Sequence, residues 1–289
     1  MNNREIDHDD DTLPDGQLIG QLVDDRFLIQ KAIGKGGAGE VFLACDTKML
    51  DRRVVVKVLL ADWIGHDDVR RKFEHEKEAL LRLDHPGIVS ILDAGTLEQG
   101  QPYIVMPFVE GQTLQRYLKE NSLPPLEICA GIIEATADAL SAAHSVGILH
   151  RDIKPANIMI SFLPSKKLRV KIIDFGIARV FESKVSPITH IGRPLGTVLY
   201  VAPEQLLGHH EQTPAADVYS CGIMAFKMLT GVRPFEPQSM FEMAELHREG
   251  LKKLPSSIRP ELGPVIDEIL LKALAYSPDE RYQEISEFG

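Results

Sequence analysis

The first candidate for chemistry is the glycine-rich turn Gly34-Lys35-Gly36-Gly37-Ala38-Gly39. Glycines let the backbone approach an anion closely and offer its N–H groups to phosphate oxygens. The same spacing also occurs in dinucleotide sites and in ordinary hairpins, so the pattern alone is not specific. The segment after the turn reads as a strand rather than a helix, which disfavours a Rossmann turn. The favoured interpretation is a phosphate-binding turn between two strands.

Lys57 interrupts the apolar run 54–60, where burying an unpaired ammonium group would be costly. The sequence therefore predicts an anionic partner for this lysine. Glu76, near the middle of the helix expected next, is the candidate, and Glu74 and Glu78 lie one face away in either direction. Taken alone, Lys57 has an alternative reading as a solvated lysine on an exposed edge strand.

Three motifs in the second half of the chain are more specific than either of these features. They are His150-Arg151-Asp152-Ile153-Lys154-Pro155-Ala156-Asn157, Asp174-Phe175-Gly176 and Ala202-Pro203-Glu204. The first fixes six residue types in eight positions, a match that would arise by accident in roughly one chain in 10⁵ of this length. In this order the motifs resemble the eukaryotic-type protein kinase superfamily in its bacterial serine/threonine form. The resemblance covers about residues 26–288.

The resemblance implies a binding site for ATP. Gly34, Gly36 and Gly39 would lie over its phosphates, while Lys57 would contact the α- and β-phosphates. Glu76 would hold Lys57 in place. The cofactors that the resemblance implies are therefore ATP and the Mg²⁺ that accompanies it.

The resemblance also implies an adenine pocket. Met106 would be its gatekeeper and Pro107 to Val109 its hinge. Pro107 departs from the glutamate common there, but that position contributes only its carbonyl to adenine, whereas Val109 must donate an N–H and is not proline. Apolar side chains would enclose the purine, although each could also be simple core: Ile33, Val41, Val55 and Met159.

For the catalytic step, the resemblance implies that Asn157 and Asp174 chelate Mg²⁺, which prefers hard oxygen ligands. Asp152 would accept the proton of the substrate hydroxyl. A carboxylate with an ordinary pKa of about 3.9 is a weak base for an alcohol, so orientation is its expected main task. Lys154 would contact the γ-phosphate and, together with Thr197, is typical of serine/threonine kinases.

Other matches within the resemblance are structural. Glu204 would form a buried ion pair with Arg281. Asp217 would accept backbone N–H groups of the catalytic segment. His150 and Phe175 would pack together and align the two segments that handle magnesium.

Arg151 directly precedes Asp152, and the resemblance implies that an arginine at this place couples activity to phosphorylation of the activation segment, residues 177–203. A phosphate group would pair with the guanidinium and order the segment. Thr189 is the favoured site, with Ser183 and Ser186 as alternatives. The competing reading is that Arg151 bonds only local carbonyl groups.

The order of the expected strands and helices along the chain indicates the fold that positions these residues. Short β-branched runs come first and helical patterns follow, which indicates an α+β fold of two lobes, a small β-rich N-lobe with one main helix and a larger, mainly helical C-lobe. The expected strands are 26–33, 40–45, 53–60, 88–93 and 103–109, and the expected helices lie at 67–85, 128–147 and 215–229. The expected parts are a disordered acidic tail (1–25), an N-lobe (about 26–106), a hinge (107–111) and a C-lobe (about 112–289).

Composition excludes several classes of protein. The 289 residues carry 32 Lys and Arg against 42 Asp and Glu, a net charge of −10 that disfavours nucleic acid as a ligand. Residues 1–25 hold eight of the acidic side chains. Cys45, Cys129 and Cys221 form no close pair, which favours packing roles in a reducing compartment, the cytoplasm. Neither a signal peptide nor a membrane span is recognisable in these residues.

The resulting hypothesis is a non-specific serine/threonine protein kinase that acts on protein hydroxyls, its own in trans included. Two alternatives remain: a nucleotide-binding scaffold that docks a partner with little turnover, and a small-molecule kinase such as an antibiotic phosphotransferase. Antibiotic phosphotransferases usually lack an element like Ala202-Pro203-Glu204 and the long activation segment before it. The chain stops at Gly289 inside what should be the last helix, consistent with a natural protein that continues, for example to a membrane tether.

Overall fold

The computed structural model describes residues 18–36, 39–59, 78, 80–165, 167–175, 198–208 and 213–289. The chain divides into two compact units. The N-terminal unit comprises Met1–Glu74 and Ser90–Val109, and the C-terminal unit comprises His75–Val89 and Glu110–Gly289.

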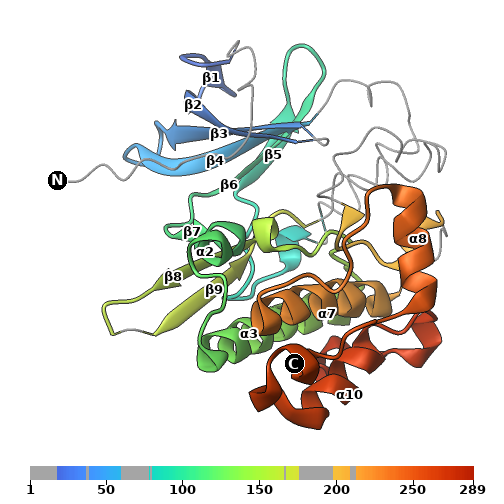
Figure 1. Cartoon of the computed structure of the whole chain (residues 1–289). Coiled ribbons are helices and arrows are strands. Elements are labelled where there is room, and N and C mark those ends of the chain that lie inside the picture. The colour runs from blue at the N-terminus through green and yellow to red at the C-terminus, as the bar shows by residue number, and fades with distance from the viewer. Residues whose placement is uncertain are drawn as a thin grey trace. The chain divides into compact units, whose positions relative to one another are not determined.

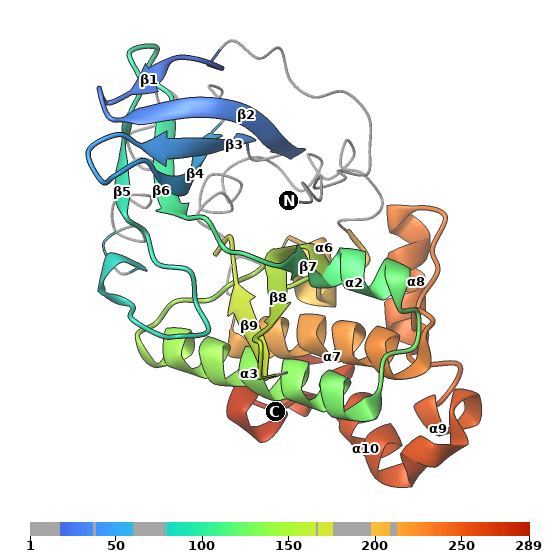
Figure 2. The ribbon, with the colours of Figure 1, turned by 90° about the vertical axis from the view of Figure 1, so that its left-hand side faces the viewer.

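The N-terminal unit is an antiparallel sheet in the order β1-β2-β3-β4-β6-β5 (Figures 1 and 2). The predicted strands at 26–33, 40–45 and 53–60 are confirmed as a meander. Their ends differ from the prediction by one to three residues. Alternate side chains of β4, such as Val54 and Val56, are fully buried in the core of this unit. The strands are β1 Leu22–Val23, β2 Phe27–Gly36, β3 Gly39–Asp46, β4 Arg52–Leu59, β5 Asp93–Thr96 and β6 Pro102–Pro107.

The strand predicted at 88–93 is wrong. Ile88 forms an isolated bridge with Ile172 of the C-terminal unit, and β5 begins only at Asp93. The backbone N–H of Ile172 donates to the carbonyl of Gly87 at 2.7 Å, and that of Val89 donates to the carbonyl of Ile172 at 3.0 Å. An apolar run shows that a segment is buried, but it does not show which strand the segment pairs with.

The C-terminal unit is built around α7 (Pro214–Thr230), which lies beside α3 (Leu126–Ser145) in both ribbon views (Figures 1 and 2). Both helices were predicted. Gly147 and Gly231 follow them with φ of +79° and +78°, the left-handed conformation that ends helices without a steric penalty. Nearly every side chain of α7 is buried. The predicted helix at 67–85 lies mostly outside the described residues.

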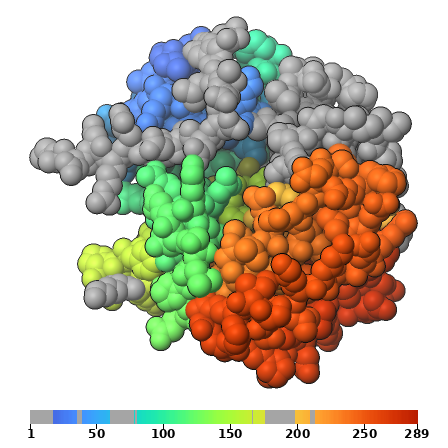
Figure 3. Space-filling model, viewed as in Figure 1, coloured from blue at the N-terminus to red at the C-terminus, as the bar shows by residue number. Residues whose placement is uncertain are grey.

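The other elements of this unit complete the frame. A small antiparallel sheet has the order β7-β8-β9. The last part of the chain, orange to red in Figure 3, covers the lower right of the face shown there. The elements are β7 Gln112–Thr113, α2 Leu114–Glu120, the 3₁₀ turn Pro155–Asn157, β8 Ile158–Phe162, β9 Leu168–Ile172, α6 Pro203–Leu206, α8 Met240–Glu249, α9 Pro255–Ile258 and α10 Gly263–Ala273.

None of the helices in the described ranges combines the length and the apolar composition that a membrane crossing needs. Cys45, Cys129 and Cys221 are free thiols and all three are buried, as predicted. Burial raises the pKa of Cys129 to about 11 and also raises that of Cys221, so both thiols stay protonated and unreactive.

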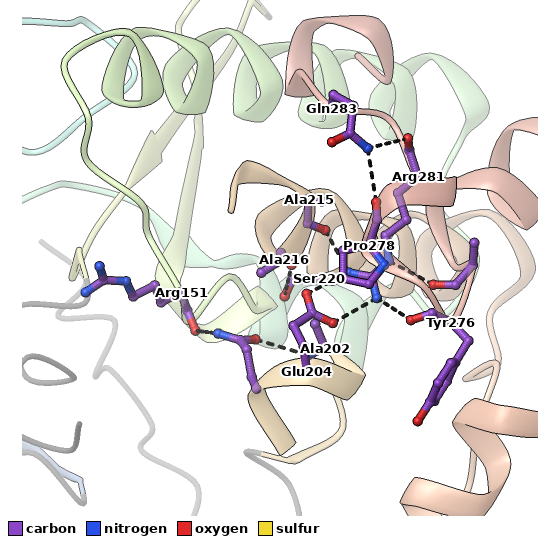
Figure 4. Close-up of polar contacts among 12 residues, drawn as sticks. Arg151, Ala202, Glu204, Ala215, Ala216, Ser220, Tyr276, Pro278, Arg281 and Gln283 are labelled. Atoms are coloured by element: carbon purple, nitrogen blue, oxygen red, sulfur yellow. Dashed lines mark hydrogen bonds and ion pairs between the residues drawn. The ribbon is translucent and has the colours of Figure 1, made fainter. Parts of the chain in front are cut away.

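The predicted buried ion pair between Glu204 and Arg281 is confirmed (Figure 4). The guanidinium lies 2.8 and 2.9 Å from the two carboxylate oxygens, and both residues are almost fully buried. The remaining donors of Arg281 reach the carbonyl groups of Ala215, Ala275 and Tyr276. All five guanidinium N–H donors therefore have an acceptor, the condition under which a buried charge is tolerated.

We expect Arg281→Met to lower the free energy of unfolding by about 3–5 kcal/mol, because it leaves the Glu204 carboxylate buried without its cation. The double variant Glu204→Leu/Arg281→Met should recover part of this loss. Arg116→Met, which removes the more exposed ion pair with Glu120, is the control and should cost less than about 1 kcal/mol. Urea denaturation measures all of them. A cost for Arg281→Met as small as that of the control would contradict the prediction.

His247 on α8 gives the C-terminal unit an acid-sensitive contact. The ring lies edge-on to Tyr219 and Phe235, with centroids 5.4 and 5.5 Å apart, and neither ring nitrogen has a hydrogen-bond partner. Burial, with a smaller contribution from nearby Arg281, lowers the pKa of His247 to about 4. The ring is thus neutral in the folded protein while the unfolded chain still takes up a proton below pH 6.5.

Stability should therefore fall as the pH is lowered through the unfolded-state pKa of His247. For a pKa of about 4 in the folded chain, the free energy of unfolding loses about 2 kcal/mol from this group between pH 8 and pH 5. His247→Phe should lose less stability over this range, as measured by urea denaturation at both values. Met243→Leu, a change on the same helix that adds no titrating group, should leave the difference as in the wild type. Equal acid sensitivity of His247→Phe and wild type would refute the prediction.

Candidate active site

The C-terminal unit brings three of the predicted catalytic residues into direct contact. The Nζ of Lys154 lies 2.8 Å from Oδ2 of Asp152. The side-chain amide of Asn157 donates to the same Oδ2 at 3.1 Å and to the backbone carbonyl of Asp152 at 2.8 Å. The tight turn Pro155–Asn157 makes this possible, because it folds Asn157 back over the preceding residues. One carboxylate thus receives an ammonium and an amide from its own loop.

Backbone strain marks two residues of this site. Arg151 and Asp174 have φ of 64° and 65°, a left-handed conformation that costs a residue other than glycine roughly 1–3 kcal/mol. Such a conformation persists only where the surrounding structure enforces it, and it is concentrated at functional sites. Here one strained residue, Arg151, directly precedes Asp152, and the other, Asp174, is a predicted magnesium ligand.

Asp217 on α7 enforces the conformation of Arg151. Its carboxylate is fully buried and accepts the backbone N–H groups of His150 at 2.8 Å and Arg151 at 2.7 Å. The ring Nε2 of His144 lies 2.8 Å away. Burial alone would raise the pKa of Asp217, but the hydrogen bond to His144 and the nearby imidazoles outweigh burial and hold this pKa below its usual value. The predicted role of Asp217 is confirmed, while the contribution of His144 was missed.

His150 packs against Phe175 as predicted, with ring centroids 4.8 Å apart. It also fixes Asp152, because its Nδ1 lies 3.2 Å from the backbone N of Asp152 and accepts that N–H. The proton of the neutral ring is then on Nε2, which faces the carbonyl of Ile173 at 3.4 Å. Burial lowers the pKa of His150 and keeps the ring neutral. The sequence alone predicted only the packing role of His150.

Asn157 and Asp174, the predicted magnesium ligands, lie at the same end of the β8–β9 pair. Ile158 and Ile172 are cross-strand partners, and the N–H of Ile173 donates to the carbonyl of Asn157 at 2.9 Å. An amide and a carboxylate suit Mg²⁺, which takes few protein ligands and completes its shell with water and substrate phosphates. No group of three His, Cys, Asp or Glu in the described part of the chain could hold a metal by itself. The donor set therefore fits Mg²⁺ carried with a phosphorylated substrate.

The N-terminal unit places several predicted nucleotide-binding residues on one face of its sheet. Val41 pairs with Lys57, and Val55 pairs with Met106, across adjacent antiparallel strands. Cross-strand partners and alternate residues of a strand share a face. The face opposite the core, which Val56 helps to form, therefore carries Val41, Val55, Lys57 and Met106.

Lys57 lies in β4, which has β3 on one side and β6 on the other, and it is only 7% exposed. The alternative of a solvated lysine on an edge strand is therefore wrong. Glu76 and Glu74 lie outside the described residues, so the predicted partner of Lys57 stays a prediction.

The glycine-rich turn is a strand-to-strand hairpin, as expected, in which Gly34 pairs with Val41 and Gly36 with Gly39. Gly39 has φ of 147°, and a Cβ there would lie 2.0 Å from the carbonyl oxygen of Val58. Glycine is thus required at this position by the close approach of β4, independently of any phosphate.

The remaining predicted residues are placed as follows. Ile33 lies in a bulge of β2 between Ala32 and Gly34, and Pro107 ends β6. Met159 in β8 is half-buried in the C-terminal unit, and Val109 follows β6 in the N-terminal unit. The phosphorylation candidates Thr189, Ser183 and Ser186, together with Thr197, lie outside the described residues.

The comparisons with known proteins agree with this geometry. Residues 27–286 match the family model of the protein kinase domain. Serine/threonine-protein kinase PknA of Mycobacterium tuberculosis (strain ATCC 25618 / H37Rv) is 36% identical over 94% of this chain and 61% of its own length. Serine/threonine-protein kinase PrkC of Bacillus subtilis (strain 168) is 40% identical over 92% of this chain and 40% of its own length.

Solved structures give the same result. A crystal structure of the M. tuberculosis PknI kinase domain is similar with a TM-score of 0.70 and 29% identity, over 91% of this chain and 92% of that one. The chain spans 61% of PknA and 40% of PrkC, so it corresponds to part of each curated relative. The family model and these relatives together show that the chain belongs to the protein kinase family.

Proposed function

We propose that this chain transfers the γ-phosphoryl group of MgATP to serine and threonine hydroxyls of proteins. The observation that carries the proposal is the contact of Asp152 with both Lys154 and Asn157 beside the strained Arg151. The names of the curated relatives, which are serine/threonine-protein kinases, support the choice of hydroxyl.

Within this proposal each unit has its own task. The face of the N-terminal sheet that carries Val41, Val55 and Met106 receives the purine, and Lys57 binds the phosphates. Asn157 and Asp174 hold Mg²⁺, which neutralises charge on the triphosphate when it is bound. The whole set assigned to nucleotide and metal is Ile33, Gly34, Gly36, Gly39, Val41, Val55, Lys57, Glu76, Met106, Pro107, Val109, Met159, Asn157 and Asp174.

Asp152 acts on the substrate hydroxyl. Its carboxylate is held by Lys154 and Asn157 and its backbone N–H by His150, so it is positioned before a substrate arrives. It orients the attacking hydroxyl and accepts its proton late in the reaction. Lys154 is near enough to Asp152 to neutralise charge on the transferred group. We place this activity in a reducing compartment, the cytoplasm, because all three cysteines are buried free thiols.

Asp152→Asn should lower phosphoryl transfer by about 10³-fold, because the amide cannot accept the hydroxyl proton. Lys57→Met should weaken ATP binding as well as transfer. Incubation with ³²P-labelled ATP and Mg²⁺ measures transfer to the protein itself and to casein, and calorimetry measures MgATP binding. The control is Asp138→Asn, an exposed carboxylate of the same unit, which should transfer at the wild-type rate. Undiminished transfer by Asp152→Asn would refute the assignment, and MgATP binding without any transfer in the wild type would favour a scaffold.

We also propose that the chain phosphorylates itself in trans within residues 177–203, with Thr189 as the main site. Thr189→Ala should then reduce the activity that the protein gains during preincubation with MgATP, while Ser183→Ala and Ser186→Ala should reduce it less. Arg151→Ala should make activity independent of preincubation, because no guanidinium is left to pair with the phosphate. Phosphopeptide mapping after preincubation identifies the site. Full activity with Thr189 unmodified would exclude it.

A further inference from the structure

Gln205 is a buried amide whose contacts neither the sequence motifs nor the proposed chemistry explain. It lies on the short helix α6 and is only 4% exposed. Its Nε2 donates to the backbone carbonyl of Arg151 at 3.1 Å, and its Oε1 accepts the backbone N–H of Ala202 at 3.1 Å (Figure 4). Only one orientation of the amide satisfies both contacts, since one partner is an acceptor and the other a donor.

The carbonyl that Gln205 binds belongs to the peptide that joins Arg151 to Asp152. The N–H of this same peptide is held by Nδ1 of His150 at 3.2 Å. The preceding N–H, that of Arg151, is held by Asp217 at 2.7 Å. These three backbone groups, two N–H groups and one carbonyl, are therefore each bound by a buried side chain. Gln205 is the one that comes from α6.

Strain makes this contact consequential. Arg151 has φ of 64°, a left-handed conformation that its surroundings must hold, and relaxation about its N–Cα bond would move the peptide that follows it. Asp217 and His150 bind N–H groups on either side, and Gln205 is positioned to oppose rotation of the carbonyl itself. Rotation of this peptide would turn the Asp152 carboxylate away from Lys154 and Asn157.

A second contact anchors α6. Glu204, the residue before Gln205, forms the buried ion pair with Arg281. In Figure 4 the two contacts leave α6 in different directions, one toward Arg281 and one toward Arg151. The helix therefore connects the helical core of the unit to the catalytic segment.

We propose that Gln205 is a positioning residue for phosphoryl transfer, which holds the carbonyl of Arg151 and thereby orients the carboxylate of Asp152. The inference rests on the proposed function of Asp152. Gln205 does not touch the reacting atoms. Its effect is on the geometry of the loop, so it should change the rate of the transfer step more than the binding of ATP.

Gln205→Met keeps the length of the side chain but removes both hydrogen bonds. We expect kcat for transfer from MgATP to casein to fall by about tenfold to a hundredfold, while KM for ATP stays within about twofold of wild type. The matched control is Gln283→Met. Gln283 likewise donates from Nε2 to two backbone carbonyls, those of Pro278 and Arg281, in the same unit, and its loss should leave kcat within about twofold.

Gln205→Glu gives a second readout that a merely structural role would not produce. The carboxylate keeps an acceptor for Ala202 but places a second oxygen against the carbonyl of Arg151. Burial favours the protonated form of such a carboxyl group, whose O–H can donate to that carbonyl. The kcat of this variant relative to wild type should therefore rise as the pH is lowered from 8 to 6, and Gln283→Glu should show no such rise.

The outcomes are distinct. A kcat of Gln205→Met within twofold of wild type, or an equal loss in Gln283→Met, would overturn the proposal. If Gln205→Met unfolds, as thermal denaturation would show, the pH profile of Gln205→Glu decides, and a flat ratio would overturn it. Asp152→Asn is measured alongside: unchanged transfer in that variant refutes the role of Asp152, whereas loss of transfer there with full activity in Gln205→Met refutes only the role of Gln205.

Discussion

The buried carboxylate of Asp217 is the constraint on which the candidate site depends. It accepts hydrogen bonds from two consecutive backbone N–H groups, those of His150 and Arg151. It also contacts the ring Nε2 of His144. A fully buried carboxylate is costly unless it is completely hydrogen-bonded, so this carboxylate strongly favours the one loop conformation that supplies those donors. That conformation includes a left-handed Arg151 directly before Asp152. A helix in the core thus determines the backbone conformation of the residue that directly precedes Asp152.

The same physical principle recurs at Arg281 and at Gln205. Each is a buried polar group whose hydrogen-bonding atoms are matched to particular partners: a carboxylate and carbonyls for the guanidinium, a carbonyl and an N–H for the amide. Buried networks of this kind contribute little net stability compared with apolar packing, but their partners must be in one arrangement. Asp217 and Gln205 bind the segment 150–157 directly, where a definite geometry matters more than additional stability.

The N-terminal unit achieves its order by a simpler rule. Alternation along β4 places Val54 and Val56 in the core and Val55 and Lys57 on the other face. A shift of one residue in the register would exchange the two sets, so the apolar core that holds the sheet together also fixes which side chains lie on the opposite face. Gly39 adds a steric condition, because no side chain fits between β3 and the carbonyl of Val58.

The sequence by itself determined the types of the main elements and the residues of the catalytic segment. Short β-branched runs separated by glycines predicted β2 to β4, the helical spacing of apolar residues predicted α3, and an apolar run closed by Gly231 predicted α7, because local patterns of apolar residues report burial directly. The motif within 150–157 named Asp152, Lys154 and Asn157 through the resemblance, but the contacts of Lys154 and Asn157 with the Asp152 carboxylate came only from the structure. The resemblance supplied Asp217 and Glu204 with Arg281.

Only the tertiary structure decided the contacts that join distant parts of the chain. Ile88 pairs with Ile172 instead of forming a strand of its own, and Gln205 reaches the carbonyl of Arg151. His144 reaches Asp217 from another helix. Such contacts depend on the direction of a side chain and on the path of the backbone around it. Neither is encoded in a local pattern, because the same residue on the same element could face solvent or any of several neighbours.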